Sequence, residues 1–125
     1  MTNNDDKEFL NKLRGEFYIE AQELLNDCQA ILENMGEHNW DDFLAIYMAN
    51  LHNVKGSSKA AEFDLFSEVI HLMEEMRDDK ISHPRFQDIS FKLLSALSNS
   101  LEKMKKGEFD SSERLFKRIL STTKK

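Results

Sequence analysis

A histidine, a lysine and a glycine lie close together in the segment His52-Asn53-Val54-Lys55-Gly56. In a helix, Lys55 and Gly56 each come about one turn after His52, so the three residues are neighbours on the surface. An imidazole offers a nucleophilic nitrogen near neutral pH, and a lysine is a positive charge for phosphoryl oxygens. Glycine in a helix interior costs about 1 kcal/mol relative to alanine, so Gly56 needs another reason, and open access to His52 supplies one. The segment therefore predicts a histidine that carries a phosphoryl group.

A second pair of polar residues, His71 and Glu74, is spaced so that both lie on one flank of a helix. With Phe66 at the centre of the apolar face, Glu74 lies about 80° and His71 about 140° from it. A carboxylate that accepts from one imidazole N–H fixes the tautomer and makes the other ring nitrogen more nucleophilic. We therefore assign His52 as the nucleophile and Glu74 as the group that orients it, with His71 beside them.

The chain has 125 residues, of which 40% are hydrophobic, and this is the size of one domain with its own core. The single cysteine, Cys28, excludes an internal disulfide. Neither an apolar N-terminal leader nor an apolar run long enough for a bilayer is present, so we expect a cytoplasmic protein. The net charge of −6 argues against nonspecific nucleic-acid binding, although residues 1–42 hold 11 acidic and 3 basic side chains.

Apolar residues recur at helical spacing along the chain, which has one proline and four glycines, so the sequence predicts helices and no strand. The first helical segment runs from about Asp5 to Met35, with a break near Gly15 that gives a short helix and then a longer one. Further helices cover about residues 40–58, 63–77 and 84–104, and the last begins at about residue 110. Pro84 suits the first turn of its helix, and Lys105-Lys106-Gly107 ends that helix.

These long amphipathic helices, joined by short polar connections, most economically form an all-α, antiparallel four-helix bundle with short additional N- and C-terminal helices. We expect one domain over residues 1–125, with the bundle at about residues 9–106 and a C-terminal helix and tail at 107–125. With Trp40 at the centre of the apolar stripe, His52 points about 120° away, at the exposed edge of the bundle. Lys55 and Lys59, at about 60° and about 100°, flank it.

The sequence His52-x-x-Lys55-Gly56 on the second long helix resembles the signature of histidine-containing phosphotransfer (HPt) domains. The segments Phe17–Leu32 and His71-Leu72-Met73-Glu74 are similar to parts of the N-terminal phosphotransfer domain of the chemotaxis histidine kinase CheA. The resemblance covers about residues 9–106. It implies that His52 is the phosphorylated histidine and that Lys55, His71 and Glu74 join it in one hydrogen-bonded network.

The resemblance implies a phosphocarrier of two-component, chemotaxis-type signalling. A histidine kinase or a phosphorylated receiver domain would place a phosphoryl group on His52, and a response-regulator aspartate with bound Mg²⁺ would remove it. If Glu74 accepts a hydrogen bond from Nδ1–H of His52, the phosphoryl group would be attached at Nε2. No Gly-rich nucleotide loop is visible in the sequence, so we expect no cofactor of the chain's own, with ATP and Mg²⁺ supplied by the partner domains. We also expect a monomer that binds neither nucleic acid nor a membrane.

One segment departs from the family pattern. After the helix that carries His52, the chain reads Lys59-Ala60-Ala61-Glu62-Phe63, where the family often has small residues or glycine around an aromatic residue. Any left-handed residue in this turn would therefore be a non-glycine residue.

The other polar and sulfur-bearing residues are assigned structural roles. Cys28 lies on the apolar stripe and is expected to be a small core residue. His38 and His83 fall in predicted turns without a carboxylate or thiol at metal-ligand spacing, so we expect ordinary loop residues and no zinc site. Basic residues near the C-terminus are assigned to a solvated helix end, with a membrane or partner patch as the alternative: Lys117, Arg118, Lys124 and Lys125.

Three alternative functions stay open. The chain could be the excised first domain of a larger chemotaxis kinase, which shares the mechanism. It could instead be a non-catalytic helical adaptor that binds and sequesters a receiver or kinase domain near His52. The third alternative, a phosphatase acting on a response regulator, has no acidic or amide residue with an evident activating neighbour.

Overall fold

The computed structural model describes residues 2–123, and side chains from Asn4 to Thr122. Within them the chain forms five α-helices: α1 Thr2–Asn34, α2 Trp40–Ala60, α3 Asp64–Glu75, α4 His83–Lys105 and α5 Phe109–Thr123. A single 3₁₀ turn, η1 Met76–Asp78, continues α3, and no strand occurs among these described residues. The prediction of an all-helical chain is confirmed.

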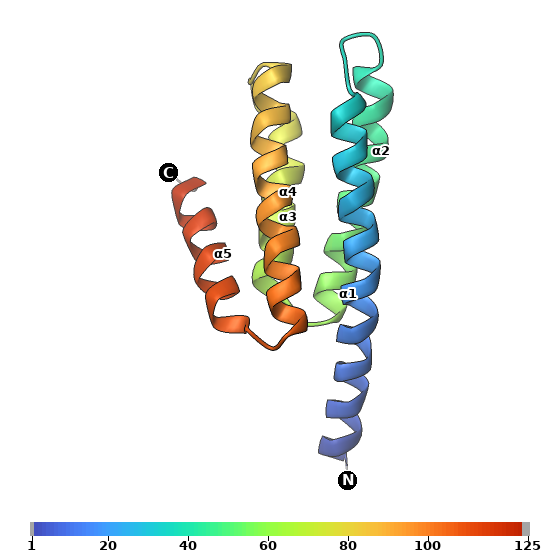
Figure 1. The fold of residues 1–125 in the computed structure, drawn as a ribbon, viewed down its shortest axis with the longest axis vertical. Coiled ribbons are helices and arrows are strands. Elements are labelled where there is room, and N and C mark those ends of the chain that lie inside the picture. Colours follow the sequence, from blue (N-terminus) through green and yellow to red (C-terminus); the bar gives the residue numbers. More distant parts are fainter. Residues whose placement is uncertain (1, 124–125) are drawn as a thin grey trace.

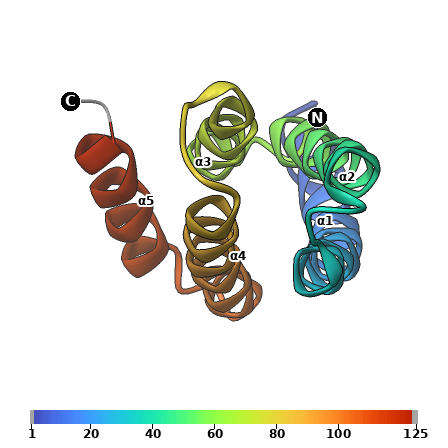
Figure 2. The ribbon, with the colours of Figure 1, turned by 90° about the horizontal axis from the view of Figure 1, so that it is seen from above.

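Successive helices run in opposite directions along one long axis (Figure 1). Helix α1 contacts α2 and α4, and α3 contacts both α2 and α4, so these four helices form a closed ring of neighbours. Helix α5 packs on α3 and α4, on the side away from α1 and α2 (Figure 2). The arrangement is compatible with a four-helix bundle to which a C-terminal helix is added. None of the described helices is long and apolar enough to cross a membrane.

The predicted break near Gly15 is wrong, and so is the separate short N-terminal helix. Helix α1 continues through Gly15, which is exposed and would leave an added Cβ with no atom within 4 Å. Glycine inside a helix costs only about 1 kcal/mol, which packing on either side can offset. Leu13 is half-buried and Phe17 is buried, so the apolar stripe passes the glycine without a change of phase. The first turns of α1 extend beyond the ends of the other helices (Figure 1).

The core lies between the helices, and most of its residues fall on the predicted apolar stripes, although Leu25 and Met48, which those stripes did not include, are also buried. Cys28 is fully buried within it, as predicted, and burial, with a smaller effect of Asp27, raises the pKa of its thiol to about 12. Tyr47 is also fully buried, and burial raises the pKa of its phenol. The largest fully buried side chains are Phe17, Leu25, Leu32, Tyr47, Leu51, Val54, Phe66, Ile70, Met73, Leu94, Leu97 and Leu101.

Two helices end in the same left-handed turn. At the end of α4, Gly107 has a φ of 82°, its N–H donates to Met104, and the N–H of Glu108 donates to Lys103, which is a Schellman motif. At the end of α2, the same pattern places Glu62 at a φ of 61°. The left-handed position in this turn is therefore occupied by a non-glycine residue, as the sequence indicated.

Candidate functional site

His52 lies on the outer face of α2, and its side chain is 71% exposed. Its neighbours Leu51 and Val54 are both fully buried, and they fix the rotation of the helix about its axis. Because side chains one position away point about 100° round the helix, burial of Leu51 and Val54 leaves His52 at the surface. The predicted position of His52 at the exposed edge is confirmed.

Glu74, near the end of α3, points across the surface towards His52. Its Oε2 lies 3.4 Å from Nδ1 of His52, and the glutamate side chain is 19% exposed. Met73 and Ile70 on the same helix are buried, which orients Glu74 towards α2. The structure thus brings together two residues that the sequence assigned to one site.

Lys55 contacts the same carboxylate. Its Nζ lies 2.6 Å from Oε1 of Glu74, and the lysine side chain is only 16% exposed. One oxygen of Glu74 therefore faces His52, whereas the other faces Lys55. The sequence predicted that Lys55 would attract phosphoryl oxygens. In this structure its ammonium group forms an ion pair with Glu74 of the neighbouring helix, α3. The pair also ties α2 to α3 beside the histidine.

His71 is the third basic residue beside Glu74. Its Nδ1 is 3.7 Å from Oε1 of Glu74, and its Nε2 is 3.3 Å from Oε1 of Glu75. Glu74 therefore lies within reach of three basic groups, contributed by His52, Lys55 and His71. The side chain of His71 is 60% exposed, somewhat less than that of His52, but its nearest ring nitrogen is farther from the Glu74 carboxylate, at 3.7 Å against 3.4 Å.

Gly56 leaves the surface open next to His52. The residue is exposed, and a Cβ added to it would meet no atom within 4 Å. The protein's own packing therefore does not require a glycine at this position. Beside it, the hydroxyl of Ser57 donates to Oε1 of Glu20 at 3.0 Å, which links this part of α2 to α1.

His83 is not the ordinary loop residue that the sequence predicted. It begins α4, its Nδ1 lies 2.9 Å from Oε1 of Glu37, and its ring stacks on Trp40 at 3.6 Å between centroids. Its carboxylate partner comes from the loop before α2, 46 positions away, so no local spacing could have indicated the contact.

His38 is an exposed turn residue, as predicted. Lys124 and Lys125 of the predicted basic end lie outside the described residues.

Arg14 is a second residue whose role the sequence did not indicate. Its Nε donates to the carbonyl of Ala61 at 3.0 Å, and its guanidinium carbon lies 4.4 Å from the centroid of the Phe63 ring. It thereby holds α1 against the turn between α2 and α3. An arginine among several charged residues in the first half of α1 gives no sequence signal for such a contact.

Within the described part of the chain, no three histidine, cysteine, aspartate or glutamate side chains gather closely enough to hold a metal ion. Comparison of the chain with protein-family models, curated proteins and solved structures finds no match. The chemistry of the site therefore has to be argued from its geometry. A carboxylate held between a lysine and an exposed imidazole can fix the tautomer of that imidazole and leave its other nitrogen free to react.

Proposed function

We propose that the chain is a histidine-containing phosphotransfer domain, in which α1 to α4 form the antiparallel bundle and His52 carries the phosphoryl group. The observation that carries the proposal is the contact of 3.4 Å between Nδ1 of His52 and Oε2 of Glu74 at an imidazole that is 71% exposed. A carboxylate at this nitrogen favours the tautomer with the proton on Nδ1. The unprotonated Nε2 is then the nucleophile.

In the loading step, the lone pair of Nε2 attacks the γ-phosphorus of ATP held by a kinase. The N–P bond forms as the bond between phosphorus and the β,γ-bridging oxygen breaks, and ADP leaves with that electron pair. No proton has to leave Nε2, and the ring, which keeps its proton on Nδ1, becomes cationic. Glu74 stabilises this cation, much as the aspartate of a catalytic triad stabilises an imidazolium. Loading from a phosphorylated receiver would differ only in the leaving group, an aspartate carboxylate.

In the unloading step, a carboxylate oxygen of a receiver aspartate attacks the phosphorus. The O–P bond forms, the N–P bond breaks, and its electron pair returns to Nε2, so the neutral imidazole is regenerated without proton loss. The kinase supplies ATP, and the partner domains supply Mg²⁺. The proposed carrier acts as a monomer in the cytoplasm.

Lys55 and Gly56 are proposed to serve the approach of the partner. Lys55 places a positive charge one turn from His52, where the phosphoryl group adds negative charge, and charge-assisted contacts to such oxygens are strong. Gly56 presents no side chain, and nothing in the protein fills the space beside it. A bulky catalytic domain can therefore reach His52 in line with the N–P bond.

The test is phosphoryl transfer from γ-radiolabelled ATP, catalysed by a CheA-type kinase core, to the wild-type protein and to His52→Gln. We expect label on the wild-type protein that is acid-labile and base-stable, and no label on His52→Gln. His71→Gln is the matched control because it removes the other imidazole near Glu74, and it should still be labelled. Label that persists in His52→Gln would overturn the assignment. Binding of the partner to both proteins without transfer would instead favour the adaptor.

A further inference from the structure

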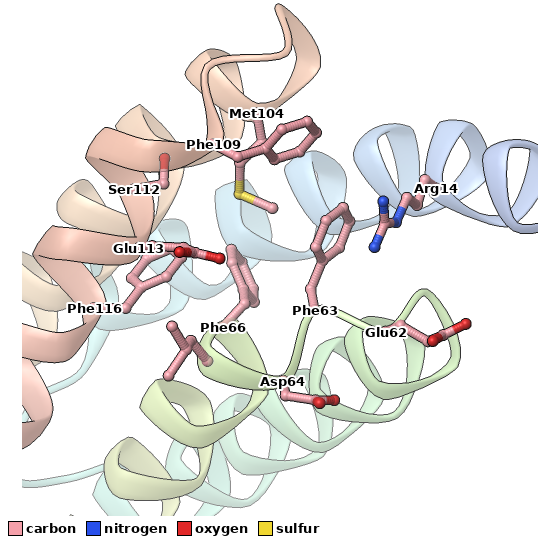
Figure 3. Close-up of a pocket in the computed structure, with 11 residues that line it drawn as sticks. Arg14, Glu62, Phe63, Asp64, Phe66, Met104, Phe109, Ser112, Glu113 and Phe116 are labelled. Atoms are coloured by element: carbon pink, nitrogen blue, oxygen red, sulfur yellow. The ribbon is translucent and has the colours of Figure 1, made fainter.

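A cavity of about 490 Å³ opens between the start of α3, the end of α4 and the start of α5. Its wall is apolar and includes Phe66, Met104 and Phe116, all of which are at least nine-tenths buried (Figure 3). Phe63 and Phe109, whose rings lie 6.1 Å apart, stand at its edge, and Phe109 is 37% exposed. We call this feature the α3–α5 groove. Its volume is in the range of natural binding pockets.

The edge of the groove is acidic. Glu62, Asp64 and Glu113 line it, and all three are exposed. In Figure 3 the carboxylate of Glu113 points towards the centre of the groove, whereas those of Glu62 and Asp64 lie at its outer side. The one cation of the lining is Arg14, and its guanidinium is already placed against Ala61 and Phe63. Three carboxylates thus line an apolar cavity whose single lining cation is already engaged.

Glu62 has no evident structural reason to be a glutamate. It occupies the left-handed position of the Schellman motif, where glycine is free of the steric penalty that a side chain carries. A non-glycine residue in this conformation costs about 1 kcal/mol or more, and such residues cluster at functional sites. The strained turn holds this carboxylate at the edge of the groove.

We propose that the α3–α5 groove binds a short segment of a partner protein that carries a bulky apolar side chain flanked by lysine or arginine. The apolar side chain would fill the aromatic cavity, as anchor residues do at protein interfaces. The basic residues would pair with Glu62, Asp64 and Glu113. The charge complementarity disfavours an acidic segment, such as residues 5–8 of a second copy, where Asp5, Asp6 and Glu8 outnumber Lys7.

The groove is separate from the surface around His52. Glu74 follows Asp64 along α3 by about 15 Å of helix, and α5 covers the face of α3 away from α2 (Figure 2). A segment bound in the groove therefore leaves His52 uncovered. The inference does not depend on the proposed phosphotransfer, since binding can be measured on its own.

The test uses two fluorescein-labelled synthetic peptides of about twelve residues, with leucine and phenylalanine at helical spacing and either lysine or glutamate at the remaining positions. Fluorescence anisotropy should show binding of the lysine peptide, weakened as NaCl rises from about 50 to about 300 mM, and none of the glutamate peptide. The double variant Glu62→Lys/Glu113→Lys should bind the lysine peptide about tenfold more weakly, because two surface ion pairs become repulsive. Phe109→Ala should also weaken binding.

The matched control is Asp27→Lys/Glu33→Lys, which reverses two exposed charges on α1 away from the groove and changes the net charge equally. It should bind the lysine peptide as the wild type does at about 150 mM salt. NMR amide shifts on peptide addition should centre on the start of α3 and of α5. Lack of binding, equal binding of both peptides, equal weakening in the two double variants, or shifts centred on α1 would each overturn the proposal.

Discussion

Nζ of Lys55 lies 2.6 Å from Oε1 of Glu74, closer to the carboxylate than Nδ1 of His52, which lies 3.4 Å from Oε2. The two contacts use different oxygens, so Lys55 does not compete with His52 for one acceptor. Both charged side chains of the pair are less than one-fifth exposed, which reduces solvent screening. Lys55 thereby holds Glu74 in the position from which it can orient the imidazole.

The first prediction concerns the stability of this pair. Lys55→Met should lower the free energy of unfolding by about 1–2 kcal/mol, because a partly buried carboxylate loses its cation. Lys55→Met and Glu74→Gln should be non-additive in a double-mutant cycle, with a coupling energy of about 1 kcal/mol. Urea unfolding of the four proteins measures it. Strict additivity would show that the ion pair contributes nothing.

The second prediction concerns the activation of His52. Glu74→Ala should slow phosphorylation by at least about tenfold, because the imidazole loses the carboxylate that selects its tautomer and stabilises its cation. The rate of label transfer from ATP by the kinase core measures this. Glu75→Ala is the matched control, since Glu75 contacts His71 on the same helix and is 63% exposed. If both variants are phosphorylated at the wild-type rate, Glu74 has no orienting role.

The helices could be predicted from the sequence because the periodicity of apolar residues reports burial directly. The same periodicity placed His52 at the exposed edge and placed Glu74 on the flank of the following helix. The predicted break at Gly15 is wrong because the apolar stripe continues through the glycine, and packing on either side offsets a propensity cost of about 1 kcal/mol.

Contacts between helices could not be predicted in the same way. The distance of Lys55 from Glu74 depends on the separation and rotation of α2 and α3, which no single helix determines. The contact of His83 with Glu37 spans 46 positions, and that of Arg14 with Ala61 spans 47. Such pairs form only after the backbone has brought their elements together, so one sequence carries no local signal for them.

The third prediction tests the strain at Glu62. Glu62→Gly should raise the free energy of unfolding by about 0.5–1 kcal/mol, because glycine adopts a φ of 61° without a steric penalty. The gain is reduced by the larger entropy of glycine in the unfolded chain. Glu108→Gly, next to the left-handed Gly107, is the matched control in an equivalent turn and should not stabilise the protein. A lower free energy of unfolding for Glu62→Gly than for the wild type would show that the backbone is not strained at this position.

The fourth prediction concerns stability at alkaline pH. Burial raises the pKa of the Cys28 thiol from its usual 9.0 to about 12, so the folded state holds this proton over a range in which the unfolded state releases it. The contribution of this thiol to the free energy of unfolding is therefore fully present below pH 9. It should be lost as the pH rises, by about 1.4 kcal/mol per pH unit for one such group. Tyr47, whose pKa burial also raises, adds to the loss above pH 10. Urea unfolding from pH 8 to 11 measures how steeply the free energy of unfolding falls with pH. Cys28→Ala should reduce this slope between pH 9 and 10. An unchanged slope in that range would contradict the assignment of the loss to Cys28.

The fifth prediction separates stability from function at Gly56. Gly56→Ala should raise the free energy of unfolding by about 0.5–1 kcal/mol, because alanine is the better helix former and its Cβ meets no atom within 4 Å. The same substitution should slow transfer catalysed by the kinase core by about tenfold, since it narrows the approach to His52.

Gly15→Ala is the matched control for this variant, because Gly15 is also an exposed glycine inside a helix with open space around it. It should stabilise the protein by a similar amount and leave transfer unchanged. Opposite effects of one methyl group on stability and on transfer, confined to position 56, would mean that the glycine is kept for the partner. Transfer at the wild-type rate in a stabilised Gly56→Ala would show that the open surface beside His52 is not used.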